Sequence, residues 1–261
     1  MVFNDRKKLP MIGSNKNIVL HIPHSSTVIP FNAGFIADKP TIREEIEKLT
    51  DWYTDELFAH DGPFIPIITP FSRIFCDVER FRNDDNEPMA KFGMGVYYTL
   101  CDDGRPLRNH SEQLQSLFIK DYYDKHHQLL TELVDDILKN AKYAIIVDCH
   151  SFPSIPLNRD LNKNTPRPDF NIGTDVFHTP LSFIETTKEY FSKLGYTVGI
   201  DWPYSGTIVP EKYLKIDKRV LSIKLEVNRD LYLIEGTTKK NEKFDQIRKV
   251  LSGWLEIVER F

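Results

Sequence analysis

Residues 17–26, NIVLHIPHSS, contain the pattern that decides the fold. The apolar run 18–20 is typical of a strand buried on both faces, and His21, His24 and two serines follow at once. In α/β proteins the crevice beyond the carboxyl ends of parallel strands is where ligands bind. The stretch therefore predicts a buried strand that carries polar groups to one edge of a sheet.

Five further apolar runs have the length of short buried strands: 65–68, 144–147, 170–172, 196–200 and 221–227. Helical spacing of apolar residues lies between or after them, over 41–49, 111–140, 179–194 and 241–261, and the segment 111–140 is expected to form one long helix or two joined ones. Thr41 followed by Glu44 predicts a capping box at the start of the first of these helices. The alternation predicts an α/β sheet covered on both faces, in a single domain of residues 1–261, with a long irregular loop over 151–169.

The composition excludes several classes of protein. The 261 residues are 41% hydrophobic with a net charge of −4, so neither nucleic acid nor an acidic membrane surface is an expected partner. No stretch approaches the roughly 18 apolar residues of a membrane span, and the first ten residues lack the apolar core of a secretory signal. Cys76, Cys101 and Cys149 form no CxxC pair, which favours a reducing, cytoplasmic location.

A second stretch repeats the opening pattern. In AIIVDCHSFPS, residues 144–154, an apolar run is followed by Asp148, His150 and Ser151. Two strands with histidines at their ends can place two imidazoles at one rim of the sheet, and imidazole is the commonest ligand of metals such as Zn²⁺. The alternative is that each histidine caps a strand or hydrogen-bonds a loop.

A carboxylate is the usual third ligand beside two histidines in a catalytic zinc site. LTDWYTDELF, residues 49–58, offers Asp51 and Asp55, which lie four apart and can share one helical face. The alternative is that Asp51 is the N-cap of a helix and that Asp55 is solvated.

Two more segments carry charged residues suited to a reaction. FSRIFCDVERFRND, residues 71–84, holds Arg73, Arg80 and Arg82, which resemble a receptor for a carboxylate, or else form a salt-bridged surface strand. In SIKLEVNRDLY, residues 222–232, Glu226 lies on the polar face of an expected central strand. It is a candidate general base for an attacking water, unless it pairs with Lys224 or Arg229.

Taken together, six motifs in this order resemble the N-formylglutamate amidohydrolase family across nearly the whole chain. They are HIPHSS (21–26), TDWYTDELF (50–58), RIFCDVERF (73–81), VDCHSFP (147–153), PYSGTIVP (203–210) and LEVNRDLY (225–232). The resemblance implies a three-layer αβα domain with a mixed, mostly parallel central sheet, of the phosphorylase/hydrolase-like type related to zinc carboxypeptidases. It also implies metal-dependent hydrolysis of N-formyl-L-glutamate, or of another N-acyl acidic amino acid, to formate and L-glutamate.

The resemblance also assigns residues. It implies one Zn²⁺, or another divalent metal, held by His24, Asp51 and His150, with Glu226 assisting the attacking water. Arg73 is expected to stabilise the oxyanion and Arg80 to bind a substrate carboxylate. A loop with Tyr204, Ser205 and Gly206 is expected to close over the substrate, which is the one partner the resemblance implies.

Some residues depart from the family pattern or favour other interpretations. Ser26 and Glu79 stand where the family usually has Gly and Asn, and the added charge of Glu79 beside Arg80 bears on substrate identity. Cys149 next to His150 suggests a cysteine amidase, but adjacent strand residues point to opposite faces. A non-catalytic protein that binds an acidic amino acid or a cell-wall fragment is the other alternative. His21 is expected to support the site through a hydrogen bond, and Asp148 to orient a ligand histidine.

Overall fold

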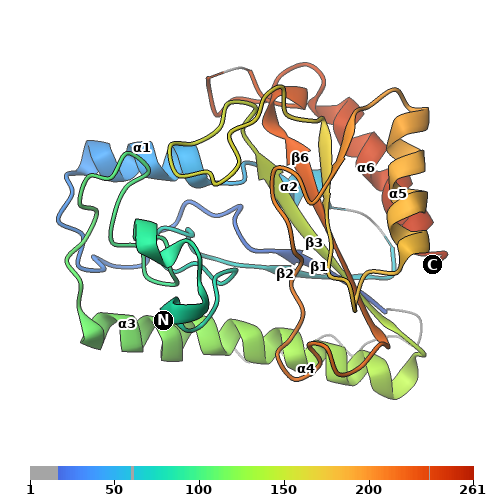
Figure 1. Ribbon diagram of the computed structural model, residues 1–261, viewed down its shortest axis with the longest axis horizontal. Helices are drawn as coiled ribbons and strands as arrows, with labels where there is room; N and C mark the ends of the chain where they lie inside the picture. The colour runs from blue at the N-terminus through green and yellow to red at the C-terminus, as the bar shows by residue number, and fades with distance from the viewer. Residues whose placement is uncertain (1–16, 60–61, 235) are drawn as a thin grey trace.

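The described part of the chain is built around a six-stranded sheet (Figure 1). The computed structural model describes residues 17–59, 62–234 and 236–261, so the segment 1–16, on which the prediction of no secretory signal rests, lies outside it. The sheet order is β2-β1-β3-β6-β4-β5, with β4 antiparallel to β6 and the other neighbours parallel. The predicted mixed, mostly parallel sheet is confirmed. The strands are β1 (Ile18–Ile22), β2 (Phe64–Ile68), β3 (Ala144–Phe152), β4 (Phe170–Gly173), β5 (Val198–Ile200) and β6 (Val220–Asn228).

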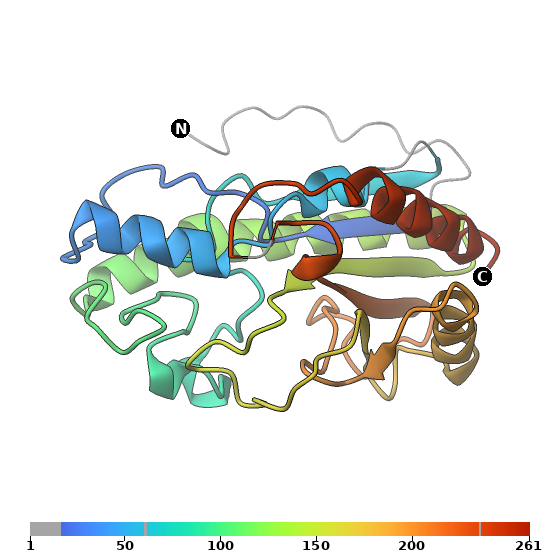
Figure 2. The same ribbon diagram turned by 90° about the horizontal axis from the view of Figure 1, so that it is seen from above.

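Helices cover both faces of the sheet, which gives three αβα layers (Figures 1 and 2). On one face α4 packs against side chains such as Val19 and Ile146, and on the other α2, α5 and α6 pack against side chains such as Leu20 and Val147. None of the described helices combines the length and the apolar composition that a bilayer-spanning helix needs. The helices are α1 (Lys39–Leu49), α2 (Thr54–Leu57), α3 (Glu112–Phe118), α4 (Asp124–Asn140), α5 (Leu181–Lys193) and α6 (Phe244–Val258).

The strand predicted over 144–147 is longer than expected, since β3 continues to Phe152. Its polar second half pairs residue by residue with β6, from Asp148 opposite Lys224 to Phe152 opposite Asn228. Polar side chains do not end the strand, because backbone pairing with β6 satisfies the buried N–H and C=O groups. Consequently His150 lies within the sheet and not in a loop after it.

One helix start differs from the prediction, and one open alternative is decided. The capping box at Thr41 is wrong: α1 begins at Lys39, and the Asp38 side chain accepts a hydrogen bond from the Thr41 N–H. Glu44 instead forms ion pairs with Lys48 and Arg105. Of the two alternatives predicted for 111–140, one long helix or two joined ones, the second is confirmed: α3 and α4 are joined by a π-helical turn over Ile119–Tyr123.

Candidate metal centre and active site

The candidate site lies at the carboxyl ends of the central parallel strands, on the face of the sheet that α4 covers. His24 follows β1, while His150 and Glu226 lie near the ends of β3 and β6. In the sheet, β2 lies on one side of β1, and β3, the next strand in the sequence, lies on the other side of β1. The strand order therefore reverses between β1 and β3. Such a switch point is the usual ligand site of open α/β sheets.

Three side chains from different parts of the chain converge there. Nδ1 of His24 lies 3.5 Å and Nδ1 of His150 lies 3.1 Å from the same oxygen, Oδ2 of Asp51. The three residues are buried, and their potential ligand atoms all lie within 4.8 Å of one another. The structure therefore brings together the three residues expected to hold the metal.

The opposite nitrogen of each imidazole is held by a buried carboxylate. Nε2 of His24 donates to Oδ1 of Asp77 at 2.8 Å, and Nε2 of His150 donates to Oδ1 of Asp148 at 2.9 Å. Metal-binding histidines characteristically donate their second ring N–H to a carboxylate, which fixes the ring orientation. The arrangement directs both Nδ1 atoms toward Asp51.

Nδ1 of His24 provides a direct test of whether a metal fits. This atom is buried and has no hydrogen-bond partner among the described residues, although it faces the oxygen of Asp51. A cation between the two atoms would satisfy both, because a deprotonated ring nitrogen and a carboxylate are ordinary zinc ligands. The donor set of two imidazoles and one carboxylate fits a zinc site with an open position.

Backbone and arginine contacts hold Asp51 in place. Its N–H donates to the carbonyl of His24 at 3.0 Å, which ties two candidate ligands together directly. Its second oxygen, Oδ1, accepts from Nη2 of Arg229 at 3.0 Å. Although burial opposes ionisation, the imidazoles of His150 and His24 hold the pKa of Asp51 below its usual range. Asp55 lies in α2 and is not part of this group.

Asp77 links the candidate metal ligand His24 to the two arginines and was not singled out from the sequence. Besides His24, its carboxylate accepts from the Tyr98 hydroxyl at 2.6 Å and from Nη2 of Arg73 at 3.0 Å, and it lies 3.2 Å from Nε of Arg80. Burial opposes ionisation, yet the neighbouring cations hold the pKa of Asp77 well below its usual range. An acidic residue inside the apolar run around 74–78 was the signal that could have identified it.

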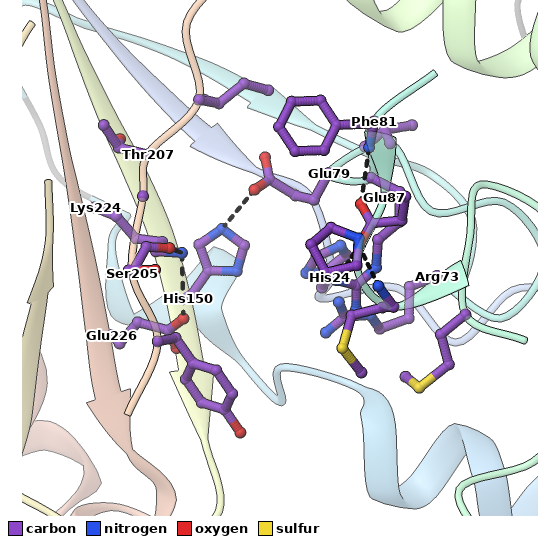
Figure 3. Close-up of a pocket in the computed structure, with 18 of the residues that line it drawn as sticks. His24, Arg73, Glu79, Phe81, Glu87, His150, Ser205, Thr207, Lys224 and Glu226 are labelled. Carbon is purple, nitrogen blue, oxygen red and sulfur yellow. Dashed lines mark hydrogen bonds and ion pairs between the residues drawn. The ribbon is translucent and has the colours of Figure 1, made fainter. Parts of the chain in front are cut away.

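Glu226 lies directly beside His150, because the two residues are opposite each other in the β3–β6 register. Burial raises the pKa of the Glu226 carboxyl more than the nearby His150 and Lys224 lower it. A raised pKa suits a group that takes up a proton and releases it again. Lys224 lies 3.9 Å from Glu226 and donates to the carbonyl of Ser205 at 3.0 Å (Figure 3).

The expected substrate-binding residues all line the same cavity, whose volume is about 1400 Å³. Arg73 and Arg80 enter it from the segment after β2, and Nη1 of Arg73 lies 3.9 Å from Asp51. Figure 3 shows Arg73 beside His24, and Glu226, Lys224 and Ser205 grouped beside His150. The cavity is larger than the roughly 300–1,000 Å³ of a common ligand pocket, so it has room for an N-acyl amino acid. The lining residues named in advance are Arg73, Arg80, Tyr204, Ser205 and Gly206.

Hydrogen bonds fasten the segment around Tyr204 to the rest of the site. The Tyr204 hydroxyl donates to Asp160 at 2.9 Å, and its carbonyl accepts from the Asn171 amide at 2.7 Å. Gly206 has a φ of 79°, a left-handed conformation that favours glycine. The segment forms a wall of the cavity.

The carboxylate of Glu79, whose charge bears on substrate identity, is directed toward two histidines of the site. Its carboxylate lies 3.3 Å from Nδ1 of His21 and 3.6 Å from Nε2 of His150, as Figure 3 shows for His150. Its charge is therefore directed toward the histidines rather than toward Arg80. Cys149 is fully buried in the core cluster on the opposite face of the sheet from His150, and burial raises the pKa of its thiol well above the usual range. This geometry does not support a cysteine nucleophile.

Comparisons with known proteins identify the family and the fold. The protein-family model of N-formylglutamate amidohydrolase matches residues 16–233. The fold is similar to the crystal structure of N-formylglutamate amidohydrolase from Ralstonia eutropha JMP134, with a TM-score of 0.79, 22% identity, and 95% of this chain and 94% of that chain covered. It is also similar to a gene product of Agrobacterium tumefaciens, with a TM-score of 0.66, 14% identity, and coverage of 94% and 92%. No curated protein matches the sequence.

Proposed function

The chain belongs to the N-formylglutamate amidohydrolase family, and from that membership we propose that it is a zinc-dependent enzyme that converts N-formyl-L-glutamate and water into formate and L-glutamate. The observation that carries the metal dependence is the convergence of two Nδ1 atoms on one oxygen of Asp51, with Nδ1 of His24 lacking a hydrogen-bond partner in the described structure. Another divalent metal of similar preference fits the same donor set.

The residues around the metal centre have distinct roles in this reaction. Bound zinc would act as a Lewis acid, which lowers the pKa of water toward about 7 and polarises the scissile carbonyl. Glu226 takes the proton of the attacking water and delivers it to the leaving amine, a use that its raised pKa supports. Arg73, 3.9 Å from Asp51, donates to the oxyanion of the tetrahedral intermediate.

Substrate recognition depends on the arginine segment and the 203–210 segment. Arg80 binds a carboxylate of the amino-acid portion through its guanidinium fork. Tyr204, Ser205 and Gly206 form the wall that borders the bound substrate. We also propose a reducing compartment such as the cytoplasm, which is supported by three free and buried cysteines, Cys76, Cys101 and Cys149.

Metal analysis together with formate release from N-formyl-L-glutamate tests the proposal. We expect one zinc ion per chain, and we expect His24→Ala and His150→Ala each to lose both the metal and turnover. Glu226→Gln should keep the metal and lose about 10²- to 10⁴-fold in kcat. Stoichiometric zinc in either histidine variant would contradict the ligand assignment. A parent protein that binds zinc but hydrolyses no N-acyl amino acid would instead be a non-catalytic binding protein.

A further inference from the structure

A row of buried polar side chains continues from His150 into the interior, and the mechanism above does not use most of it. Asp148 receives Nε2 of His150 and Nδ1 of His21 on the same oxygen, Oδ1, each at 2.9 Å. Nε2 of His21 lies 2.8 Å from Nε2 of His126 on α4. We call His150, Asp148, His21 and His126 the histidine chain.

Asp148 is the fixed point of the histidine chain. It is fully buried, and both of its carboxylate oxygens have hydrogen-bond partners. A carboxylate oxygen accepts hydrogen bonds and an imidazole N–H donates them, so both imidazoles can donate to the one oxygen Oδ1. Its other oxygen, Oδ2, accepts from the backbone N–H of Ile208, in the segment that borders the substrate. Asp148 therefore connects a metal ligand, the interior and the substrate wall.

His126 ends the histidine chain on the helix that covers this face of the sheet. It is 2% exposed, does not line the cavity, and has Thr69 Oγ1 3.5 Å from its Nδ1. Burial, together with the neighbouring His21 and His127, lowers the pKa of His126 well below its usual range, so the ring is neutral. Exactly one hydrogen can lie between the two Nε2 atoms, and it binds His21 to α4 whichever ring carries it.

The histidine chain limits how His150 can turn. Rotation of the His150 ring away from Asp51 would break its bond to Asp148, and Asp148 cannot follow because His21 and Ile208 hold it from other directions. His21 in turn is held between Asp148 and His126. A buried polar network with every member satisfied makes the core rigid and specifies one arrangement.

We propose that His21 and His126 are positioning residues of the metal centre, which hold Asp148 so that Nδ1 of His150 faces the metal. The inference rests on the proposed function, because it takes His150 as a metal ligand. His126 acts across the α4–sheet interface without touching metal or substrate.

The affinity of the purified protein for zinc, measured by competition with a chelating dye, tests this proposal. We expect His126→Phe to weaken zinc binding about 10-fold, the lower end of the range for direct hydrogen-bond partners of ligand histidines, because His126 acts through His21 and Asp148. His126→Gln, which keeps a hydrogen-bonding group of similar reach, should restore most of the affinity. The visible spectrum of the Co²⁺-loaded protein should change in His126→Phe and not in His126→Gln, because it reports ligand geometry.

Leu133→Ala is the matched control for lost packing. Leu133 is a buried residue of α4, the helix that also carries His126, and it packs in the core between α4 and the sheet. It takes no part in the histidine chain. Its truncation should lower the free energy of unfolding and leave the zinc affinity unchanged. If His126→Phe does not fold, His126→Asn gives the same comparison, because its amide is too short to reach His21.

The outcomes separate this inference from the proposed function. Parent-like zinc affinity in His126→Phe or His126→Asn, or an equal loss in Leu133→Ala, would overturn the positioning role. Failure of His126→Gln to restore affinity would also overturn it. If the parent protein itself binds no zinc, the proposed metal dependence fails first.

Discussion

Asp77→Asn tests whether one buried carboxylate holds both the candidate metal ligand His24 and the pair Arg73 and Arg80 in place. The amide oxygen can still accept from His24 and from the Glu79 N–H, which now bind Oδ1. The amide NH₂ replaces Oδ2, which receives the Tyr98 hydroxyl and Nη2 of Arg73. The Tyr98 hydroxyl and the Arg73 guanidinium would then face an NH₂ group, which also donates and cannot accept their hydrogen bonds. Arg73 and Arg80 would lose the negative charge buried beside them.

The expected cost follows from this geometry. Removal of one partner from a buried ion pair costs about 3–5 kcal/mol, because it leaves an uncompensated charge. We expect Asp77→Asn to lower the free energy of unfolding by that amount at pH 7, measured by urea titration of the metal-free protein. Asp124→Asn makes the same change in an exposed pair with Arg82, so it should cost at most about 1 kcal/mol.

The pH dependence provides a second check on the same variant. In the folded protein the pKa of Asp77 is held below its usual value of about 3.9. The ionised carboxylate therefore contributes its full share to the free energy of unfolding above about pH 3.9, and this contribution is lost as the pH falls through the pKa of the folded state. The difference between the parent protein and Asp77→Asn should therefore be constant from pH 7 to about 5 and shrink below about 4. A cost under about 1 kcal/mol at pH 7, or one that grows on acidification, would refute the reasoning.

Three further outcomes follow from the site. Chelation of zinc should lower stability by about 2.7 kcal/mol relative to protein with free zinc at a hundred times Kd, as calorimetry would measure, and His150→Ala should show no such difference. Cys149→Ala should keep the parent kcat/KM, because the thiol is buried on the opposite face of the sheet; loss of turnover there would favour cysteine chemistry. Gly173→Ala should lower Tm and raise KM, because an added Cβ would collide with the Gly206 carbonyl and the Lys224 side chain; an unchanged KM would show that the 203–210 segment does not border the substrate.

Much of the fold was predictable because it depends on local patterns. The apolar runs that became β1, β3 and β6 are buried on both faces, so their hydrophobicity is continuous and easily recognised. The errors lie at boundaries, where one side chain competes with another: Asp38 caps α1 in place of Thr41. The length of β3 was also missed, because its polar end is paired with a strand that follows it by some 70 residues in the sequence.

Part of the candidate site was also predictable from local sequence patterns, and part required the tertiary structure. Residue types and motif order were enough to name His24, His150 and Glu226, since each follows or ends an apolar run that places it at the rim of a parallel sheet. The choice of Asp51 over Asp55 required the turn before α2, which brings the Asp51 backbone to the His24 carbonyl. No local pattern contains that information.

The sequence by itself determined the layers of the sheet and the residues able to carry the chemistry, because hydrophobic period and side-chain type are properties of short segments. Only the tertiary structure decided how those residues are held. His21 meets Asp148 across 127 positions of sequence and His126 across 105, and Asp77 joins His24 to Arg73 and Arg80. Such contacts exist only once the strands and α4 have packed, because burial makes each polar group require a partner that its own segment does not supply.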